Sequence, residues 1–306
     1  MRGVRLVRSG IEGVRARGNA LAALMVALLL AACTTSEALQ PMPSASALDL
    51  AATGKYAAVV VDGSNGQMLY QANATAPRYP ASLTKMMTLY MLFEAMQQGR
   101  VTNATPIPVS AYAASRPPSK LGVRPGDSIP AISAIQALCT KSANDVAVAV
   151  AEYLGGSEEQ FAAMMTTRAR QLGMTGTTFQ NASGLPDPGQ RTTARDMALL
   201  GMALRQRFPS QYGYFSARDF AYRGRLVRGH NDLLGRVHGV DGIKTGYIRA
   251  SGYNIVTSVN ADGRKLVVVV MGGATAKARN AEVEALIMRY LPQASRPGGG
   301  ALLSWN

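Results

Sequence analysis

The chain has 306 residues, of which 47% are hydrophobic and 16% are charged, and its formal net charge is +14. This composition indicates a globular protein of one or two domains and excludes an intrinsically disordered chain. A strongly basic protein often binds nucleic acid, but the sequence contains no nucleic-acid-binding motif, so we expect no nucleic-acid partner.

Residues 1–32 predict an export signal, a signal peptide, and not a part of the folded domain. An uncharged apolar run covers 19–32, and it is shorter than the roughly 20 residues that a membrane-spanning helix needs. The run follows a basic segment that contains Arg2, Arg5, Arg8, Arg15 and Arg17. A basic start, a short apolar run and small residues at its end are typical of a signal peptide.

The apolar run ends at Leu30-Ala31-Ala32-Cys33. This stretch resembles a bacterial lipobox, whose cysteine is lipidated after cleavage, and a lipid on Cys33 would hold the protein on a membrane. The alternative is ordinary cleavage after an Ala-x-Ala-like site, with Cys33 incidental. We therefore expect an exported protein of the periplasm or cell envelope. An anionic envelope is the neighbour that the basic charge predicts, and a solvated basic surface without a partner is the alternative.

Lipidation of Cys33 would leave Cys139 as the one remaining cysteine of the two in the sequence. A single cysteine forms no internal disulfide, and without a Cys-x-x-Cys pair the sequence predicts no cysteine-based metal site. Residues 33–52 are small, polar and proline-containing, which predicts a tether that precedes a domain over 53–292. The glycine-rich end, 293–306, is predicted to be a disordered tail.

The predicted domain begins with a β-hairpin. Two apolar segments, 56–61 and 67–70, flank a stretch with Asp-Gly and Asn-Gly pairs that favours a turn. Residues 82–98 are apolar on nearly all sides and predict a buried helix. Further helices are predicted over 130–139, 143–153, 158–172 and 194–207. Thr193 and Asp196 form a plausible cap for the last of these.

Strand character returns late in the chain. Residues 254–259 and 266–271, separated by the turn residues 260–263, predict a second buried hairpin, and 277–291 predict a final amphipathic helix. Strands at both ends with helices between them predict an α+β fold. Its antiparallel sheet is built from both chain ends and flanked by helices, and a second lobe is mainly helical.

The histidines do not suggest a catalytic triad. The sequence has only His230 and His238, and no Gly-x-Ser-x-Gly motif presents a serine. We interpret both as ordinary surface or structural histidines.

Ser82-Leu83-Thr84-Lys85 indicates a serine that is activated by lysine. Positions i and i+3 share one face of a helix, so the Lys85 side chain reaches toward the Ser82 oxygen. Ser82 at the helix start would meet the positive end of the helix dipole. In an apolar helix Lys85 loses solvation, which disfavours its charged form and makes it a better base. The alternative is that Lys85 extends to the surface.

Two further motifs follow Ser82-x-x-Lys85: Ser142-Ala143-Asn144 and Lys244-Thr245-Gly246. This trio, in this order, resembles the serine penicillin-recognising enzymes of the β-lactamase and DD-peptidase superfamily. The closest resemblance is to the low-molecular-mass D-Ala-D-Ala carboxypeptidases, peptidase family S11, and it runs from about Ala51 to Leu291. Supporting stretches are 80–87, 142–145, 184–187, 193–198 and 239–246. A second Ser-x-Asn, Ser258-Val259-Asn260, is predicted to lie in a hairpin turn and receives no role.

The resemblance implies a role for each matching residue of the first two motifs. Ser82 would be the nucleophile and Lys85 its general base. Ser142 would relay a proton to the leaving amine, and Asn144 would hold the substrate backbone.

The third motif and its surroundings would bind substrate. Lys244 would supply positive charge, the Thr245 hydroxyl would bind the substrate carboxylate, and Gly246 would let a peptide lie close to the strand. The backbone N–H groups of Ser82 and Tyr247 would form the oxyanion hole. Tyr247 stands where many members carry histidine. Arg279 would meet the terminal carboxylate, and the alternative is an ordinary surface charge on the last helix.

These roles imply a carboxypeptidase that removes the terminal D-Ala from peptidoglycan pentapeptides through a Ser82 acyl-enzyme, with β-lactams as inhibitors and no metal or organic cofactor. One alternative is DD-endopeptidase action on peptidoglycan crosslinks, which sequence cannot separate. A β-lactamase is disfavoured because the chain has no glutamate between Glu159 and Glu282 to activate water. An inactive binder of wall peptides is the remaining alternative. Many members add a C-terminal β domain, which we do not expect here, so membrane attachment would fall to Cys33.

Overall fold

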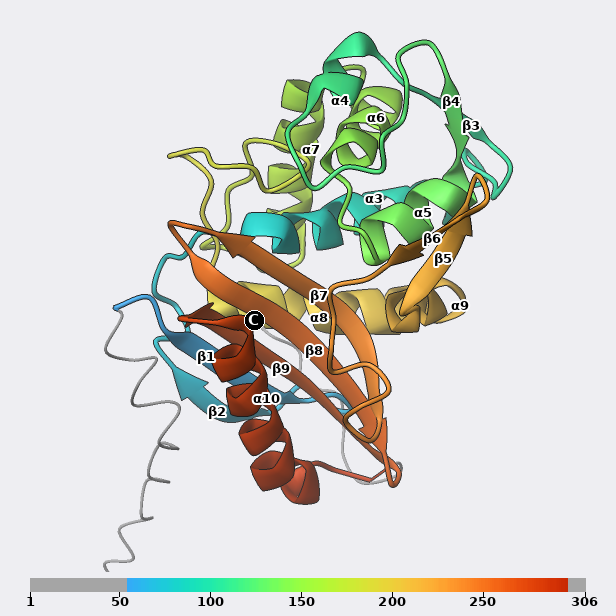
Figure 1. The fold of residues 1–306 in the computed structure, drawn as a ribbon. Helices are drawn as coiled ribbons and strands as arrows, with labels where there is room; N and C mark the ends of the chain where they lie inside the picture. The colour runs from blue at the N-terminus through green and yellow to red at the C-terminus, as the bar shows by residue number, and fades with distance from the viewer. Residues whose placement is uncertain (1–53, 297–306) are drawn as a thin grey trace, which may run out of the picture. The chain divides into compact units, whose positions relative to one another are not determined.

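The computed structural model describes residues 54–296. At its centre is a five-stranded antiparallel sheet with the strand order β2-β1-β9-β8-β7 (Figure 1). The early and late hairpins of the chain lie side by side because β1 pairs with β9. The strands are β1 (Ala57–Asp62), β2 (Met68–Ala72), β7 (Val240–Ile248), β8 (Gly252–Ala261) and β9 (Arg264–Gly273).

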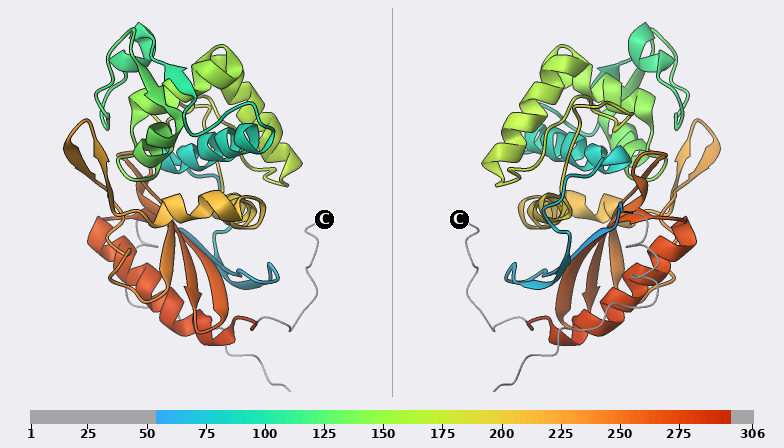
Figure 2. Two further views of the ribbon diagram at one scale, coloured as in Figure 1. Left: turned by 90° about the vertical axis from the view of Figure 1, so that its right-hand side faces the viewer. Right: turned by 90° about the vertical axis from the view of Figure 1, so that its left-hand side faces the viewer.

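Both faces of the sheet are buried, which explains why β1 and β9 are continuous apolar runs. Side chains alternate between the faces of a strand, so Val267 and Val269 of β9 join one core cluster. Val268 and Val270 of the same strand join the other. The first cluster lies against the helical lobe, and the second lies against α10 (Ala276–Tyr290). The side views of Figure 2 show α8 (Ala194–Arg207) and α10 on opposite sides of the sheet.

The helical lobe packs around α3 (Lys85–Gln97), which is buried on nearly all sides, as its sequence predicts. The other members of this lobe are α4 (Ala111–Ser115), α5 (Ala131–Cys139), α6 (Asn144–Gly155) and α7 (Glu158–Gln171), with a short hairpin of β3 (Pro106–Pro108) and β4 (Ser128–Pro130). A second short hairpin of β5 (Asp219–Tyr222) and β6 (Arg225–Arg228) precedes β7. The smaller helical elements are η1 (Ala81–Thr84), α9 (Pro209–Tyr212), η2 (Gly213–Ser216) and η3 (Leu291–Gln293).

The predicted α+β fold, with a sheet from both chain ends and a helical second lobe, is confirmed. The predicted cap is also present, because the Thr193 side chain accepts a hydrogen bond from the backbone N–H of Asp196. Two local predictions are wrong. The helix expected from Ser82 begins at Lys85, and Ser82 lies in the 3-10 turn η1. Ser258 and Asn260 lie within β8 and not in a turn, because β8 stays paired with β9 as far as Ala261.

The predicted boundary at residue 292 is a few residues too early. Ala294 is fully buried, and the backbone N–H of Ser295 donates to Asp62 at 2.6 Å. Residues 293–296 therefore pack against the sheet. The rest of the predicted tail, 297–306, lies outside the described residues, as do the predicted signal peptide, Cys33 and the tether.

Among the helices of residues 54–296, none is both long enough and apolar enough to cross a membrane.

Candidate active site

Ser82 lies in a turn that two glycines, Gly184 and Gly246, approach closely. Ala81, directly before it, has a φ of 49°, in the left-handed region that a residue with a side chain rarely adopts. A Cβ on Gly184 would lie 1.8 Å from the carbonyl oxygen of Ala81. A Cβ on Gly246 would lie 3.1 Å from the backbone nitrogen of Ser82. The sequence suggested that Gly246 lets a substrate peptide lie close to the strand. The structure shows that Gly246 also lets the strand approach the turn that carries Ser82.

Lys85 is fully buried as the first residue of α3, so it does not extend to the surface. Its Nζ lies 3.1 Å from Ser82 Oγ and 2.7 Å from Asn144 Oδ1, and it also donates to the carbonyl oxygen of Ser183. Burial lowers the pKa of Lys85 well below its ordinary value, and the positive charge of Lys244 lowers it further. The carboxylates of Asp145 and Glu158 oppose this shift.

The three neighbours of the Lys85 amine fit its neutral form. A neutral amine has two N–H groups and one lone pair. Asn144 Oδ1 and the Ser183 carbonyl oxygen can only accept, so they take the two N–H groups. The ammonium form of Lys85 donates its third N–H to Ser82 Oγ. In the neutral form the direction of this bond reverses, and the lone pair accepts from the Ser82 hydroxyl. This arrangement can remove the proton of Ser82 when its oxygen attacks an electrophile.

Ser142 is a strained and unpartnered residue that lines the same cavity as Ser82. Its φ is 59°, and its side chain is buried with a relative exposure of 5%. Its Oγ has no hydrogen-bond partner among the described residues. A buried hydroxyl without a partner costs about 1–3 kcal/mol, and strained residues of this kind are concentrated at functional sites. A bound substrate could supply the missing partner.

Asn144 begins α6 and joins Lys85 to a neighbouring loop. Its Oδ1 accepts from Lys85, and its Nδ2 donates to the carbonyl oxygen of Pro117 at 2.9 Å. Its backbone N–H donates to the carbonyl oxygen of Ser119 at 2.7 Å. One N–H of the side-chain amide remains free of these contacts. The Asn144 amide therefore orients the lysine and can also reach a substrate.

Asp145 is a buried carboxylate whose role the sequence did not reveal. It accepts hydrogen bonds from the backbone N–H groups of Leu121 at 3.0 Å, Gly122 at 2.8 Å and Val123 at 3.3 Å. These bonds hold the loop that contains Pro118 and Ser119, which line the site. The only signal in the sequence is the place of Asp145 directly after Asn144.

Lys244 lies in β7 and is almost completely buried. Its Nζ donates to the carbonyl oxygen of Thr245 at 2.9 Å. Burial lowers the pKa of Lys244 to about 8; the nearby Cys139 thiol opposes this shift, and Arg279 adds to it. A group with this pKa is largely protonated at pH 7, so the site keeps a positive charge here.

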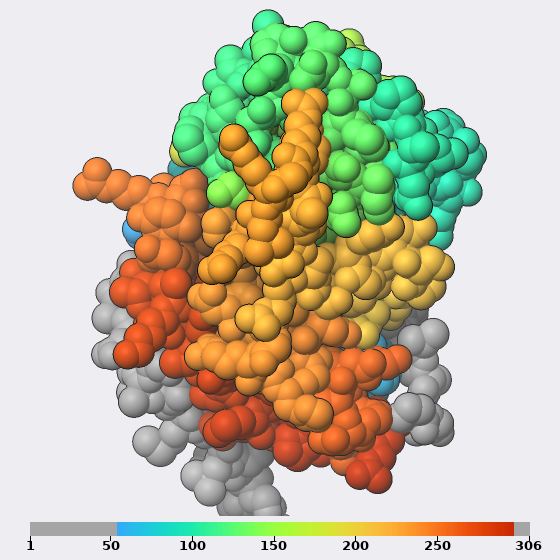
Figure 3. All heavy atoms as spheres, turned by 45° about the vertical axis from the view of Figure 1, so that its right-hand side comes forward, coloured from blue at the N-terminus to red at the C-terminus, as the bar shows by residue number. Residues whose placement is uncertain are grey.

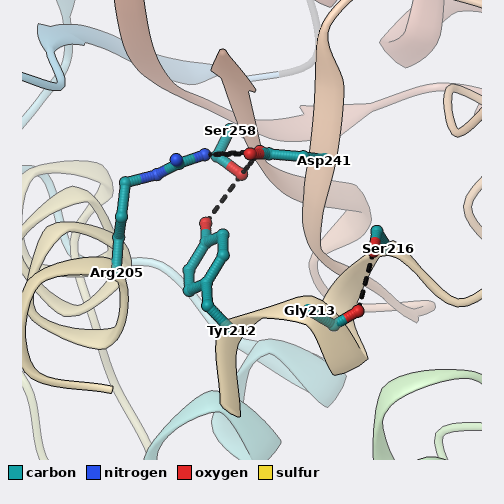
Figure 4. Close-up of polar contacts among 6 residues, drawn as sticks. All are labelled: Arg205, Tyr212, Gly213, Ser216, Asp241 and Ser258. Carbon is teal, nitrogen blue, oxygen red and sulfur yellow. Dashed lines mark hydrogen bonds and ion pairs between the residues drawn. The ribbon is translucent and has the colours of Figure 1, made fainter. Parts of the chain in front are cut away.

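Polar contacts among Arg205, Tyr212, Asp241 and Ser258 fix the start of β7 (Figure 4). The Asp241 carboxylate accepts from Arg205 of α8 and, at 2.6 Å, from the hydroxyl of Ser258 in β8. Tyr212 of α9 donates to Ser258 at 2.7 Å. Ser258, which received no role from its motif, thus contributes to the position of the strand that carries Lys244.

A cavity of about 460 Å³ brings most of the predicted site residues together. The residues from the prediction that line it are Ser82, Ser142, Asn144, Thr245, Gly246, Tyr247 and Arg279. Lys85 is not in the lining, because it lies buried behind Ser82, and Lys244 lines an adjoining cavity.

Arg279 is buried and is not an ordinary surface charge. Its guanidinium donates to the carbonyl oxygen of Asn254 at 3.1 Å and to the side chain of Asn280 at 2.6 Å. Burial lowers its pKa to about 10. The residue still carries a positive charge at pH 7, and it lines the cavity.

Tyr253 and His230 are among the lining residues that the sequence analysis did not predict. Tyr253 lies against Tyr247, with ring centroids 4.3 Å apart, and both line the cavity. His230 also lines it. Burial, with Lys244 and Lys141, lowers the pKa of His230. The other histidine, His238, has a side-chain exposure of 81%.

A family model described as D-alanyl-D-alanine carboxypeptidase matches residues 42–275. The chain is similar to the D-alanyl-D-alanine carboxypeptidase DacA of Escherichia coli K12, with 37% identity over 236 residues, 75% of this chain and 59% of the relative. The chain thus spans less than two thirds of the length of that protein.

Solved structures give the same result. Penicillin binding protein 5 from Haemophilus influenzae has a TM-score of 0.73 and 33% identity, over 76% of this chain and 69% of that chain. Penicillin-Binding Protein D2 from Listeria monocytogenes, in its ampicillin-bound form, has a TM-score of 0.68 and 29% identity, over 81% of this chain and 98% of that chain.

Proposed function

Since the chain belongs to the D-alanyl-D-alanine carboxypeptidase family, Peptidase_S11, we propose that it removes the terminal D-Ala from peptidoglycan pentapeptides through an acyl-enzyme on Ser82. The observation that carries this proposal is the buried Lys85 amine, 3.1 Å from Ser82 Oγ, with acceptors for its two N–H groups. The family model supports the substrate, and the geometry supports the mechanism.

In the acylation step, Ser82 Oγ attacks the carbonyl carbon of the penultimate D-Ala while its proton passes to Lys85. The carbonyl oxygen becomes an oxyanion that accepts hydrogen bonds from the backbone N–H groups of Ser82 and Tyr247. Each such donor contributes about 3 kcal/mol to transition-state stabilisation. The contact of Gly246 with the Ser82 backbone supports this pairing, since it joins the strand to the serine turn.

The C–N bond then breaks, and the leaving amine must gain a proton. We assign the relay from Lys85 to Ser142, whose buried hydroxyl lacks a partner until substrate arrives. Lys244 keeps a positive charge next to this path, which favours transfer of the proton toward the amine. Asn144 orients the lysine and can hold the substrate backbone through its free N–H.

A carboxypeptidase must also recognise the free carboxylate of its substrate. The hydroxyl of Thr245 lines the cavity, and Arg279 adds a positive charge to the same wall. A buried guanidinium is well suited to a carboxylate, because its hydrogen bonds are charge-assisted. D-Ala then leaves, and a water molecule that loses its proton to Lys85 hydrolyses the ester.

β-Lactams should acylate the same serine, since the Listeria relative has an ampicillin-bound form. Rapid turnover of a β-lactam needs a carboxylate that activates water. Asp232 is the only carboxylate among the described residues that line the catalytic cavity, and its charge acts on Arg279, the residue assigned to the substrate carboxylate, and not on a position assigned to water. Glu158 is held by the Ala182 N–H and the Tyr112 hydroxyl. We therefore propose slow release and not β-lactamase activity.

We also propose that the protein is exported and attached to a membrane of the cell envelope through a lipid on Cys33. The support is the sequence of residues 1–33 alone, which lies outside the described residues. Metabolic labelling with a fatty-acid analogue should label the wild type and not Cys33→Ala. Equal labelling of the two proteins would contradict the lipid anchor.

The test of the main proposal compares the wild type with Ser82→Ala. The wild type should release D-Ala from a pentapeptide and bind a fluorescent penicillin covalently, and Ser82→Ala should do neither. Ser216→Ala is the matched control, because this exposed serine only closes a local turn by donating to Gly213. Labelling of Ser82→Ala at the wild-type level would refute the assignment of the nucleophile.

A further inference from the structure

His230 lies where two cavities meet. It belongs to the irregular segment between β6 and β7, and it lines the catalytic cavity. It also lines an adjoining cavity of about 700 Å³, between β7 and the segment that carries β5 and β6. Figure 3 shows this segment projecting from one face of the described domain, beside the helical lobe. The mechanism proposed above does not use His230.

The position of Thr245 indicates what His230 could bind. Among the described residues, those that line both cavities are Gly229, His230, Asp232 and Thr245. The Thr245 hydroxyl is proposed to bind the carboxylate of the leaving residue. Part of His230 is exposed, so a ligand in the cavity can reach it. A carboxylate bound at Thr245 would therefore lie close to the His230 ring.

The surroundings of His230 disfavour its charged form in the free enzyme. Burial lowers the pKa of His230 most, and the positive charges of Lys244 and Lys141 lower it further. The backbone of Lys141 and the carboxylate of Asp232 oppose this shift. The ring is therefore mostly neutral at pH 7 in the free enzyme, and its N–H can still donate a hydrogen bond.

Charged groups reach the two cavities from each element around His230, and cations outnumber carboxylates. The cations are Lys141 after α5, Arg218 before β5, Arg228 in β6, Arg236 after it, Lys244 in β7 and Arg279 in α10; the carboxylates are Asp219 and Asp232. Arg236 forms an ion pair with Glu284. The other titratable groups of the two linings are Cys139, Tyr247 and Tyr253. This excess of positive charge opposes protonation of His230 and attracts an anion.

A bound carboxylate should reverse the effect on His230. An opposite charge favours the charged form of a titratable group, so the pKa of His230 should rise when the carboxylate binds. A group whose pKa rises on binding makes binding tighter as the pH falls. The gain in affinity is complete below the pKa of the free enzyme and is lost above the pKa of the complex. Substrate should therefore bind more tightly in the acidic range.

We propose that His230 is a binding residue for the carboxylate of the leaving residue, together with Thr245 and Arg279, and that protonated His230 binds this carboxylate more tightly than neutral His230. This inference rests on the proposed function, because the carboxylate belongs to the proposed substrate. It makes the affinity for substrate depend on pH through a residue that takes no part in the chemistry at Ser82.

The experiment measures binding without turnover. Ser82→Ala removes the proposed nucleophile, so calorimetry can give the dissociation constant of a pentapeptide at about pH 5 and about pH 7.5, the range in which histidine changes its charge. His230→Gln, in this background, removes the titrating ring. His238→Gln is the matched control, because the His238 side chain is 81% exposed and lies outside both linings. His230→Arg supplies a positive charge at both pH values.

The C-terminally amidated pentapeptide is the control ligand without the carboxylate. In Ser82→Ala, with or without His238→Gln, the pentapeptide should bind about fivefold more tightly at the lower pH, because a charge-assisted hydrogen bond is about twice as strong as a neutral one. His230→Gln should lose this gain, and His230→Arg should bind tightly at both pH values. The amidated peptide should bind equally to all four proteins. Any pH dependence that remains in His230→Gln measures the contributions of Lys85 and Lys244.

Three results would overturn the role of His230: an unchanged pH dependence in His230→Gln, the same pH dependence for the amidated peptide, or an equal loss of affinity for both peptides in His230→Gln, which would indicate a structural role only. The protein with Ser82 intact is assayed in parallel for release of D-Ala and for acylation by a fluorescent penicillin. Inactivity in both assays would instead refute the proposed function. Activity in both, with binding that does not depend on His230, would refute only this inference.

Discussion

Replacement of Gly184 by alanine should disrupt the turn that carries the nucleophile. The new Cβ would lie 1.8 Å from the carbonyl oxygen of Ala81. Ordinary contacts between heavy atoms are about 3.5 Å, so the two segments must separate by roughly 1.7 Å. Gly184 also has a φ of 85°, a conformation that alanine adopts only at a cost of about 1–2 kcal/mol.

These two effects predict the size of the loss. Overpacking in a well-packed region typically costs about 1–3 kcal/mol, and the strained φ adds to it, so we expect a destabilisation of about 2–5 kcal/mol. A displacement of about 1 Å at a reacting atom can reduce a rate about 100-fold. Acylation of Ser82 should therefore fall by about two orders of magnitude in the protein that remains folded.

Gly99→Ala is the matched control. Gly99 has a similar φ of 72°, but nothing lies within 4 Å of the position of its Cβ. Urea unfolding gives the loss of stability for both variants, and a fluorescent penicillin gives the acylation rate at a temperature where both are folded. The proposed contact between Gly184 and the serine turn would be refuted by two results together. Gly184→Ala and Gly99→Ala would lose the same free energy of unfolding, and Gly184→Ala would be acylated at the wild-type rate.

Three other predictions follow from the site. The acylation rate should rise with pH as Lys85 loses its proton and fall above pH about 8, where Lys244 becomes neutral. In a stopped-flow assay, Lys244→Arg should move the fall of the rate to higher pH. A fall at an unchanged pH would contradict the assignment of this fall to Lys244. Asp145→Ala should lower the free energy of unfolding by about 2–4 kcal/mol, because it removes the acceptor of three loop N–H groups and of the Val146 N–H. In the same urea titration Asp187→Ala should lower it less, because this half-buried carboxylate accepts from a single backbone N–H, that of Gly189. Arg279→Gln should reduce kcat/KM for a pentapeptide about 10-fold or more, but not for the C-terminally amidated peptide; equal losses on both would argue for a structural role only.

The strands and helices that the sequence predicted are those whose pattern is local. The hairpin of β8 and β9 is predicted by two apolar segments with turn residues between them. The helix α3 is predicted by residues 82–98, a segment that would be apolar on nearly all sides of a helix. The strand β7 was expected only from the resemblance, at Lys244-Thr245-Gly246, since Gly242 and Gly246 give it little strand propensity. It is a strand because it pairs with β8. The start of α3 was misplaced for a similar reason, because Gly184, about a hundred residues later in the chain, contacts the turn before it.

The motifs gave most of the candidate site, but not the parts that depend on the backbone or on loops. Lys85 has the Ser183 carbonyl oxygen as a partner, and a carbonyl oxygen has no sequence signature. Asp145 acts through three backbone N–H groups of a loop, and His230 reaches the cavity from an irregular segment. Such residues become visible only when the fold brings distant segments together.

The central claim is that burial holds Lys85 in a form that can take the proton of Ser82. The most direct measurement is an NMR titration of the lysine side chains labelled with ¹³C at Cε, with Lys85 assigned from the spectrum of Lys85→Arg. The account predicts one lysine resonance, absent in Lys85→Arg, that titrates well below the ordinary lysine pKa of about 10.4. A Lys85 resonance that titrates at the ordinary value would contradict it.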